Sequence, residues 1–184
     1  MLTDKQHQLL TDIARKSIKH GLEKGTPLAI NITEIPEDLT VARASFVTLE
    51  KHGQLRGCIG MLEARRPLIE DIAYNSFAAA FSDPRFPPLI EDELNDLNIH
   101  LSILSPSEPI PCRSEAELIE QLRPNIDGLI LDDGQHRATF LPSVWESLPN
   151  PIDFIHQLKI KAGLSENYWS TQLKAYRYTT ESFE

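Results

Sequence analysis

The hydrophobic pattern begins with a helical repeat near the N-terminus. Apolar residues recur at helical intervals over residues 4–24, and Thr3 and Gln6 stand at capping-box spacing ahead of them. Gly21 and Gly25 mark the predicted end of this helix. The chain is therefore expected to open with one long amphipathic helix.

The period then changes from helical to strand-like. Residues 26–40 contain two prolines and are predicted to be irregular, whereas residues 42–49 suit a strand. A turn-like segment over residues 51–54 leads into residues 55–60, which can return as a second strand. This part of the chain predicts a β-hairpin.

A second helix and a second type of strand follow. Pro67 suits the first turn of a helix that ends near Phe81. Three prolines make residues 83–88 a stiff loop, because proline removes amide donors and restricts the residue before it. Residues 97–103 alternate between apolar and polar and predict a half-buried strand.

The C-terminal half repeats this mixture of elements. Ser114 and Glu117 stand at capping-box spacing and predict the start of a helix, and residues 129–131 and 138–141 predict the arms of a hairpin. A helix over 152–162, ended by Gly163, and a last strand over 174–179 follow. Together the elements indicate an α+β fold with a mixed sheet and flanking helices. At 184 residues, with no repeat and no long linker, the chain is predicted to be a single domain over residues 1–184.

Composition excludes several classes of function. The formal charge of -9 argues against nucleic-acid binding, which depends on Lys and Arg contacts with phosphates. No segment is long and apolar enough to predict a membrane-spanning helix, and the N-terminus does not look like a secretory signal. A cytoplasmic location is therefore expected. Two cysteines are too few for a disulfide scaffold and are expected to be free thiols.

The first candidate for chemistry is Cys58. On a regular strand, Arg56, Cys58 and Gly60 would share one face, and a guanidinium near the sulfur would favour the nucleophilic thiolate. Gly57 and Gly60 leave room for a backbone or a ligand. The alternative is that Cys58 is a small buried residue, Arg56 a surface charge, and the glycines a bulge or bend in the sheet.

Other candidates are weaker. Asp83 and Arg85 lie in the proline-rich loop, where they can bind a polar ligand or pair with each other and with nearby backbone. His100 lies on the polar side of its predicted strand, and it can be interpreted either as a base or as an ordinary exposed histidine. Cys112 has no partner at a recognisable spacing. No paired spacing predicts a metal site, and no nucleotide or dinucleotide motif predicts a cofactor.

The segment Leu55-Arg56-Gly57-Cys58-Ile59-Gly60 resembles the signature of the AMMECR family, known in prokaryotes as protein A of the AmmeMemoRadiSam system. The resemblance continues in order through residues 79–89, 104–105, 137–142 and 161–164. It implies two unequal lobes with a cleft between them, lined by Cys58 with Arg56, Gly57 and Gly60 beside it. It also implies association with a Memo-type protein and a radical S-adenosylmethionine enzyme, but no established reaction.

Two positions depart from the pattern of many members of that family. Lys159 replaces a cysteine, which removes a resolving thiol and argues against a dithiol redox mechanism. His100 replaces an acidic residue. Two functions stay open: a cysteine-dependent enzyme acting on a small polar or anionic molecule, and a non-catalytic accessory protein. In the enzyme, Cys58 would be the nucleophile and Asp83 or His100 would handle protons, while Arg56 or Arg85 would hold the charge of the substrate.

Overall fold

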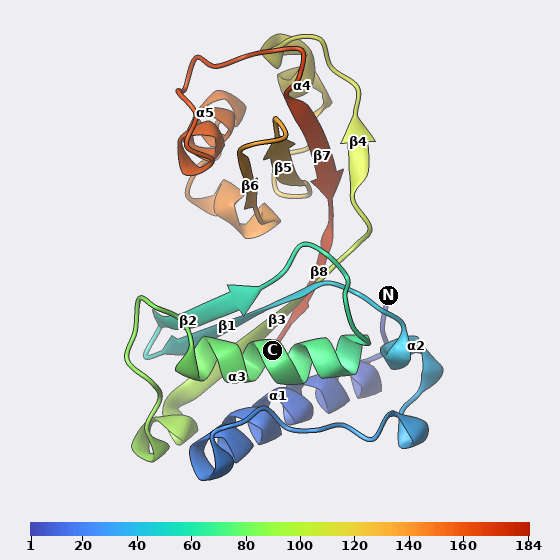
Figure 1. Ribbon diagram of the computed structural model, residues 1–184, viewed down its shortest axis with the longest axis vertical. Coiled ribbons are helices and arrows are strands. Elements are labelled where there is room, and N and C mark those ends of the chain that lie inside the picture. Colours follow the sequence, from blue (N-terminus) through green and yellow to red (C-terminus); the bar gives the residue numbers. More distant parts are fainter. The chain divides into compact units, whose positions relative to one another are not determined.

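The computed structural model describes residues 1–184, which form two compact units. Unit 1 comprises residues 1–104 and 181–184, and unit 2 comprises residues 105–180. Each unit has its own four-stranded sheet and its own helices (Figure 1). This mixture of helices and sheets confirms the predicted α+β class. The single domain over residues 1–184 and the cleft between two lobes stay predictions.

The first helix, α1 (Asp4–Lys24), has the predicted bounds. Thr3 caps it: its hydroxyl accepts from the Gln6 amide, and the Gln6 side chain accepts in return from the Thr3 amide. Gly25 follows the last turn with a φ of 72°, a conformation that favours glycine. Local signals therefore determine both ends of α1.

Gly21 has a different role from the predicted one, since it is buried inside α1 and does not end it. A Cβ at this position would lie 2.4 Å from the Phe81 ring and 2.8 Å from the Phe77 ring. Both rings belong to helix α3 (Leu68–Phe81), which ends at Phe81 as predicted, while Pro67 is its N-cap residue and lies just before the first turn. The glycine allows α1 and α3 to pack closely (Figure 1).

The sheet of unit 1 has the strand order β2-β1-β3-β8. Its strands are β1 (Ser45–Lys51), β2 (Gln54–Gly60), β3 (Leu97–Leu104) and β8 (Thr180–Phe183). The β1–β2 hairpin and strand β3 confirm the two predictions for this region. The segment predicted to be irregular contains two short helices, η1 (Ile32–Glu34) and α2 (Glu37–Thr40), and a further one, η2 (Glu91–Asp96), precedes β3.

One face of this sheet packs against α1 and α3 (Figure 1). Val47 and Leu49 of β1 are fully buried. Their partners on β3 are Leu101, which is fully buried, and Ile99, which is almost fully buried. The residues that alternate with them, such as Thr48, are only half-buried. The strands therefore have a helix-facing side that forms the core and an opposite side with polar residues.

Unit 2 has the strand order β4-β7-β5-β6. Its elements are β4 (Glu108–Ile110), α4 (Glu115–Gln121), β5 (Gly128–Asp132), β6 (Arg137–Phe140), η3 (Pro142–Glu146), α5 (Pro151–Lys161) and β7 (Lys174–Tyr178). The predicted hairpin and both predicted helices are confirmed. In the core the rings of Trp145 and Phe154 stack with centroids 3.8 Å apart.

The predicted strand over residues 174–179 is confirmed as β7 (Lys174–Tyr178), but the prediction that it is the last strand is wrong. The chain continues into β8, and the two strands belong to different sheets. The segment around Thr179 joins them, and its amide donates to the Ser105 hydroxyl. A continuous run of strand-forming residues can thus serve two sheets, which periodicity alone does not reveal.

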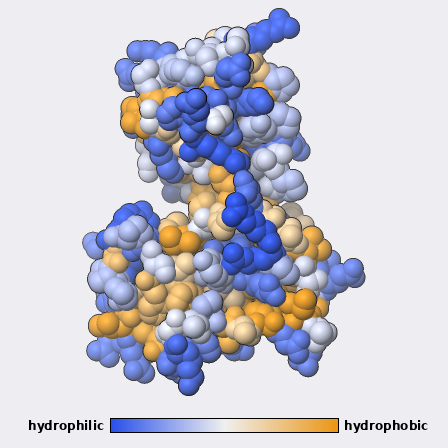
Figure 2. Space-filling model, viewed as in Figure 1, coloured by the Kyte–Doolittle hydropathy of each residue, from blue (hydrophilic) through white to orange (hydrophobic).

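Hydrophilic and hydrophobic residues are interspersed over the visible face of both units (Figure 2). Exposed apolar side chains such as Val41 and Ile90 occur in several elements. Single exposed apolar residues are normal for a globular protein. None of the helices combines the length and the hydropathy that crossing a membrane requires.

Candidate functional site

The turn between β1 and β2 determines how the two strands begin to pair. Its central residues, His52 and Gly53, both have positive φ, 52° and 73°, as in a type I′ turn. A regular ladder continued from this turn would place Cys58 opposite Val47. Because Val47 is fully buried on the helix-facing side, Cys58 would then be a core residue.

A β-bulge changes this outcome. The register shifts by one residue at Arg56, which opposes no residue of β1. Cys58 consequently pairs with Thr48, which alternates with the buried Val47 and Leu49. One extra residue in β2 therefore moves the Cys58 side chain to the side of the sheet away from α1 and α3.

The partner of Cys58 on this side is a hydroxyl group. Thr48 Oγ1 donates to Cys58 Sγ over 3.3 Å, and Thr48 also pairs across β1 with His100 on β3. Cys58, Thr48 and His100 thus form a row across three strands. Adjacent strands lie ~4.8 Å apart, so the backbones of Cys58 and His100 are roughly 10 Å apart. The histidine belongs to the same face but not to the immediate surroundings of the sulfur.

Protein atoms fill the space beside both signature glycines. A Cβ on Gly57 would lie 2.1 Å from the Ala79 carbonyl oxygen of α3. A Cβ on Gly60 would lie 2.3 Å from the ring of Phe46, its partner on β1. The sequence left open whether these glycines make room for protein atoms or for a ligand. Protein atoms approach closely at both positions, and ligand binding by Gly57 or Gly60 stays a prediction.

The loop predicted from its prolines holds the outer edge of β2. The Cys58 amide donates to Asp83 Oδ2 over 2.9 Å, and Arg85 Nη2 donates to the Cys58 carbonyl over 3.4 Å. Asp83 and Arg85 also pair directly, with Nη2 and Oδ2 2.7 Å apart. Because β2 is an edge strand, the two side chains take the place of a neighbouring strand at Cys58.

The electrostatics of this pair limit what Asp83 can do. The Arg85 guanidinium bonded to Asp83 holds the pKa of that carboxyl well below its usual range, and the Cys58 amide adds to the effect. A carboxylate this acidic stays ionised near neutral pH and is a weak proton acceptor. Asp83 is placed to fix the Cys58 backbone, while the Arg85 side chain is about half exposed (54%) and contributes the cation nearest to this backbone.

Arg56 does not share the face of Cys58, and the predicted same-face arrangement is wrong for this residue. Its guanidinium donates to both carboxylate oxygens of Glu93, over 3.0 and 2.9 Å, and to the Pro87 carbonyl. Lys51, on the helix-facing side of β1, reaches Glu93 as well. The bulge is the physical reason, because it breaks the alternation between Arg56 and Cys58.

This cluster also accounts for the acidity of Glu93. The bonded Arg56 lowers the pKa of Glu93 to about 2, with smaller contributions from the Ile90 amide and Lys51. Both side chains of the pair are largely buried. Arg56 therefore binds β2 to the segment before β3, and its predicted role in ligand binding stays a prediction.

His100 lies between two carboxylates. Its Nε2 is 3.3 Å from Glu50 and its Nδ1 is 3.2 Å from Glu184, while Nε2 is buried without a well-aligned hydrogen bond. A histidine placed between carboxylates can accept or hold a proton. Its catalytic role stays a prediction.

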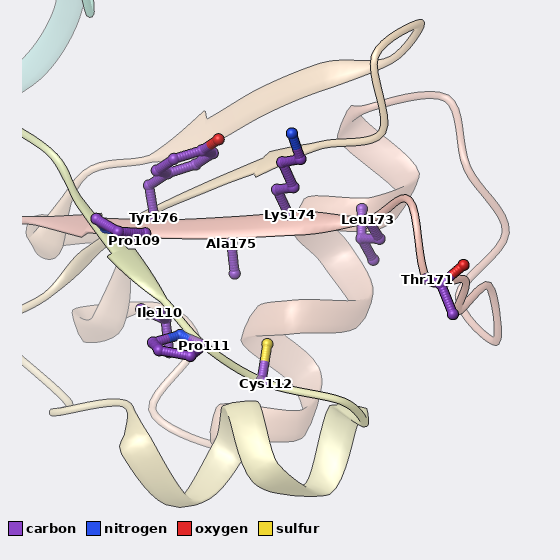
Figure 3. A pocket seen from close by; sticks show the side chains of 9 residues that line it. All are labelled: Pro109, Ile110, Pro111, Cys112, Thr171, Leu173, Lys174, Ala175 and Tyr176. Carbon is purple, nitrogen blue, oxygen red and sulfur yellow. The ribbon is translucent and has the colours of Figure 1, made fainter.

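Cys112 is also free and half-buried, but its surroundings differ. It follows Pro111 after β4 and lines a pocket of about 280 Å³ together with residues of β7 (Figure 3). Burial and the negative charge of Glu117 raise the pKa of the Cys112 thiol. The thiolate form of Cys112 is therefore disfavoured.

The order of the signature, the hairpin and the loop along the chain agrees with one known family. The family described as AMMECR1 matches residues 11–183, which covers nearly the whole sequence. The chain belongs to the AMMECR1 family. The family domain therefore includes both compact units and the Cys58 region.

Similar proteins of this family occur in archaea and bacteria. A protein from Methanothermobacter thermautotrophicus is 34% identical over 188 residues, which is 99% of this chain and 95% of the relative. One from Thermotoga maritima is 40% identical over 153 residues, covering 82% and 83% of the two chains. The crystal structure of an uncharacterised protein from Pyrococcus horikoshii has a TM-score of 0.91 at 29% identity, covering 98% of this chain and 92% of that one.

Two residues of this AMMECR1 domain were not expected at the site from the sequence. Thr48 is the hydrogen-bond donor to the sulfur, and Glu93 holds Arg56. Thr48 could have been found from the hairpin only by including the bulge in the register. Glu93 lies 37 residues from Arg56 and has no local signal. No group of three metal-binding side chains is arranged to hold an ion.

Proposed function

We propose that the chain is a cysteine-dependent enzyme that acts on a small polar or anionic compound at Cys58. The observation that carries the proposal is the bulge at Arg56, which turns the Cys58 side chain out of the helix-facing core and places its sulfur beside the Thr48 hydroxyl. A small residue needed only for core packing would require neither feature. The thiol of the half-buried Cys58 is the group on this face best suited to nucleophilic attack.

Each neighbouring group then has a task. The sulfur forms a bond to an electrophilic carbonyl carbon, the π electron pair of the carbonyl moves to its oxygen, and the thiol proton passes to a base. Thr48 orients the sulfur through its hydrogen bond, and Arg85 attracts a negative charge on the substrate. His100 is the proposed base and acts through an intervening water or substrate group, because it lies one strand beyond Thr48.

The proposal is tested first by reagent charge. Iodoacetate and iodoacetamide alkylate thiols by the same displacement of iodide but differ by one negative charge. In Cys112→Ser protein, the ratio of the iodoacetate rate to the iodoacetamide rate at Cys58 should fall in Arg85→Gln, because the nearby cation is lost. Arg15→Gln, which changes the same charge on α1, serves as the control. An unchanged ratio in Arg85→Gln would remove Arg85 from the site.

The second test concerns catalysis itself. The protein is incubated with a library of small anionic compounds that each carry an electrophilic carbonyl group, and covalent adducts are detected by intact mass. A substrate should give a Cys58 adduct and turnover that are both lost in Cys58→Ser and retained in Cys112→Ser. Turnover retained in Cys58→Ser would contradict the enzyme proposal.

An accessory role is the second candidate, and one observation favours it. Asp83 is engaged by Arg85 and strongly acidic, and no carboxylate or imidazole is hydrogen-bonded to the Cys58 sulfur. A nucleophile without an adjacent base suits a carrier or a contact residue. In this role the protein would work with a Memo-type protein and a radical S-adenosylmethionine enzyme.

Co-expression separates the two candidates. This chain, a Memo-type protein and a radical S-adenosylmethionine enzyme are co-expressed and purified through a tag on this chain. The affinity of this chain for each of the other two is measured at low and physiological salt, because charge-steered contacts weaken with salt. Stable association together with no turnover by the isolated chain supports the accessory role. Absence of association in both buffers contradicts it.

A further inference from the structure

A small cavity in unit 2, separate from both cysteines, contains two arginines. Its volume is about 160 Å³, and its lining includes Arg123, Arg177, Glu108, Ser105 and Thr179. Arg177 lies on β7, whereas Arg123 lies in the segment that follows α4. Two guanidinium groups from different elements therefore line one concave site, a common arrangement for binding oxyanions.

Arg177, one of the two arginines that line this cavity, has an unused donor. Its Nε is buried without a hydrogen-bond partner, and its Nη1 makes only a long bond of 3.5 Å to the Gln121 carbonyl. Glu108 pairs with Arg177 across the strands, but its carboxylate stays 3.8 Å from Nε and its side chain is 74% exposed. A buried donor without an acceptor is costly, so an acceptor that reaches Nε when the Glu108 side chain moves away would be favoured.

Arg123 is held rigidly by a buried carboxylate. Its Nε and Nη2 donate to Asp127 Oδ1 over 3.0 and 2.6 Å, and the Asp127 side chain is fully buried. The hydrogen bonds that Arg123 donates to the Asp127 carboxylate raise the pKa of Arg123. This guanidinium is charged and fixed before any ligand arrives, which reduces the entropy lost on binding.

We propose that this cavity binds a phosphate group, held by Arg177 and Arg123. A planar carboxylate is satisfied by one guanidinium, whereas a tetrahedral phosphate can accept from two guanidinium groups that belong to different elements. The Glu108 carboxylate is the competing anion, and it swings into solvent when phosphate enters. The site is independent of Cys58 and of the function proposed for it.

The test uses inorganic phosphate and the full chain. Phosphate is titrated at pH 7 against sodium chloride of equal ionic strength, and the arginine Nε–H signals are followed by NMR. The Arg177 and Arg123 signals should shift together and saturate. Parallel titrations with methyl phosphate and acetate separate the sources: equal binding of both phosphates indicates the phosphate group itself, and loss of methyl phosphate binding indicates free phosphate.

Substitutions should change the affinity in opposite directions. Arg177→Gln should weaken phosphate binding about tenfold, the usual effect of losing a charge-assisted hydrogen bond. Arg177→Lys retains the charge and the fold and should weaken binding less. Glu108→Gln should strengthen binding, since the competing carboxylate is removed. Arg113→Gln, the same charge change at an exposed position of unit 2, should leave the affinity unchanged.

Three results would overturn the proposal. The first is the absence of saturable shifts at Arg177 with phosphate. The second is acetate binding as tightly as phosphate, and the third is equal weakening by Arg177→Gln and Arg113→Gln, which would indicate general charge screening. Circular dichroism melting of each variant confirms that the compared proteins are folded.

Discussion

The two cysteines of this chain are both free and half-buried, yet their surroundings differ. Cys58 lies on a strand whose backbone is held from outside by Asp83 and Arg85, and its sulfur accepts from Thr48. Cys112 follows a proline, and burial together with Glu117 raises its pKa. The two thiols are similarly exposed, so their hydrogen bonds and nearby charges are what distinguish them.

The largest expected effect comes from Gly57→Ala, which disturbs the Cys58 strand and leaves the Cys112 region intact. The new Cβ would lie 2.1 Å from the Ala79 carbonyl, so α3 must move. Overpacking against backbone should lower the free energy of unfolding by about 3 kcal/mol. Chemical denaturation provides the measurement.

Gly25→Ala is the matched control. Its Cβ would meet nothing within 4 Å, and its cost comes only from a φ of 72°. It should cost about 1 kcal/mol. An equal loss in the two variants would mean that α3 does not pack as closely on β2 as the structure shows.

Asp83→Asn should have the next largest effect. The substitution replaces a buried carboxylate that accepts from the Cys58 amide and from Arg85. The loss of charge-assisted hydrogen bonds should cost about 2 kcal/mol. The Cys58 amide should also exchange with solvent faster than in the wild type, as hydrogen exchange by NMR would reveal. Unchanged protection of this amide would show that Asp83 does not hold the strand edge.

The effect of Glu93→Gln on stability should depend on pH. Because the folded protein lowers the pKa of Glu93 from 4.5 to about 2, its contribution to stability is complete above about pH 4.5 and is lost as the pH falls toward 2. The stability difference between wild type and Glu93→Gln should therefore be largest near pH 6 and shrink by pH 3. Urea denaturation at both pH values measures it. A difference that does not change with pH would contradict an ionised Glu93 bonded to Arg56.

The smallest effect is expected from Thr48→Val, which keeps the shape and removes the hydroxyl. Alkylation of Cys58 by iodoacetamide should slow by roughly threefold, because the hydrogen bond that orients the sulfur is lost. This factor corresponds to about 0.7 kcal/mol for a weak bond to sulfur. Cys112 in the same protein should react at an unchanged rate. A change at both cysteines would indicate a general loss of structure.

Local signals in the sequence were enough to predict much of the fold. The capping box at Thr3, the proline at position 67 and the alternation over residues 97–103 each involve neighbours within a few positions. A bulge at the signature glycines was one alternative, but its presence beside Gly57 and its effect on Arg56 could not be predicted in the same way, because the register between two strands defines both. A regular alternation therefore put Arg56 on the wrong face.

The candidate site shows the same limit. Its central cysteine was identified from the signature, but the contacts that define its surroundings join residues far apart in the chain. Asp83 is 25 residues from Cys58, and Glu93 is 37 residues from Arg56. The proline-rich loop could be predicted to be stiff, but only the packed structure shows that its carboxylate and guanidinium face the edge of β2.

Alkylation of the native protein tests the central claim most directly. Rates with iodoacetamide at pH 7 are compared for Cys58 in Cys112→Ser and for Cys112 in Cys58→Ser, and again in denaturant, where the two thiols should react alike. In the native protein Cys58 should react several-fold faster than Cys112, because the raised pKa of Cys112 limits its thiolate and the bulge presents the Cys58 sulfur outside the helix-facing core. Equal rates, or a Cys58 that is protected relative to Cys112, would contradict a reactive centre at Cys58.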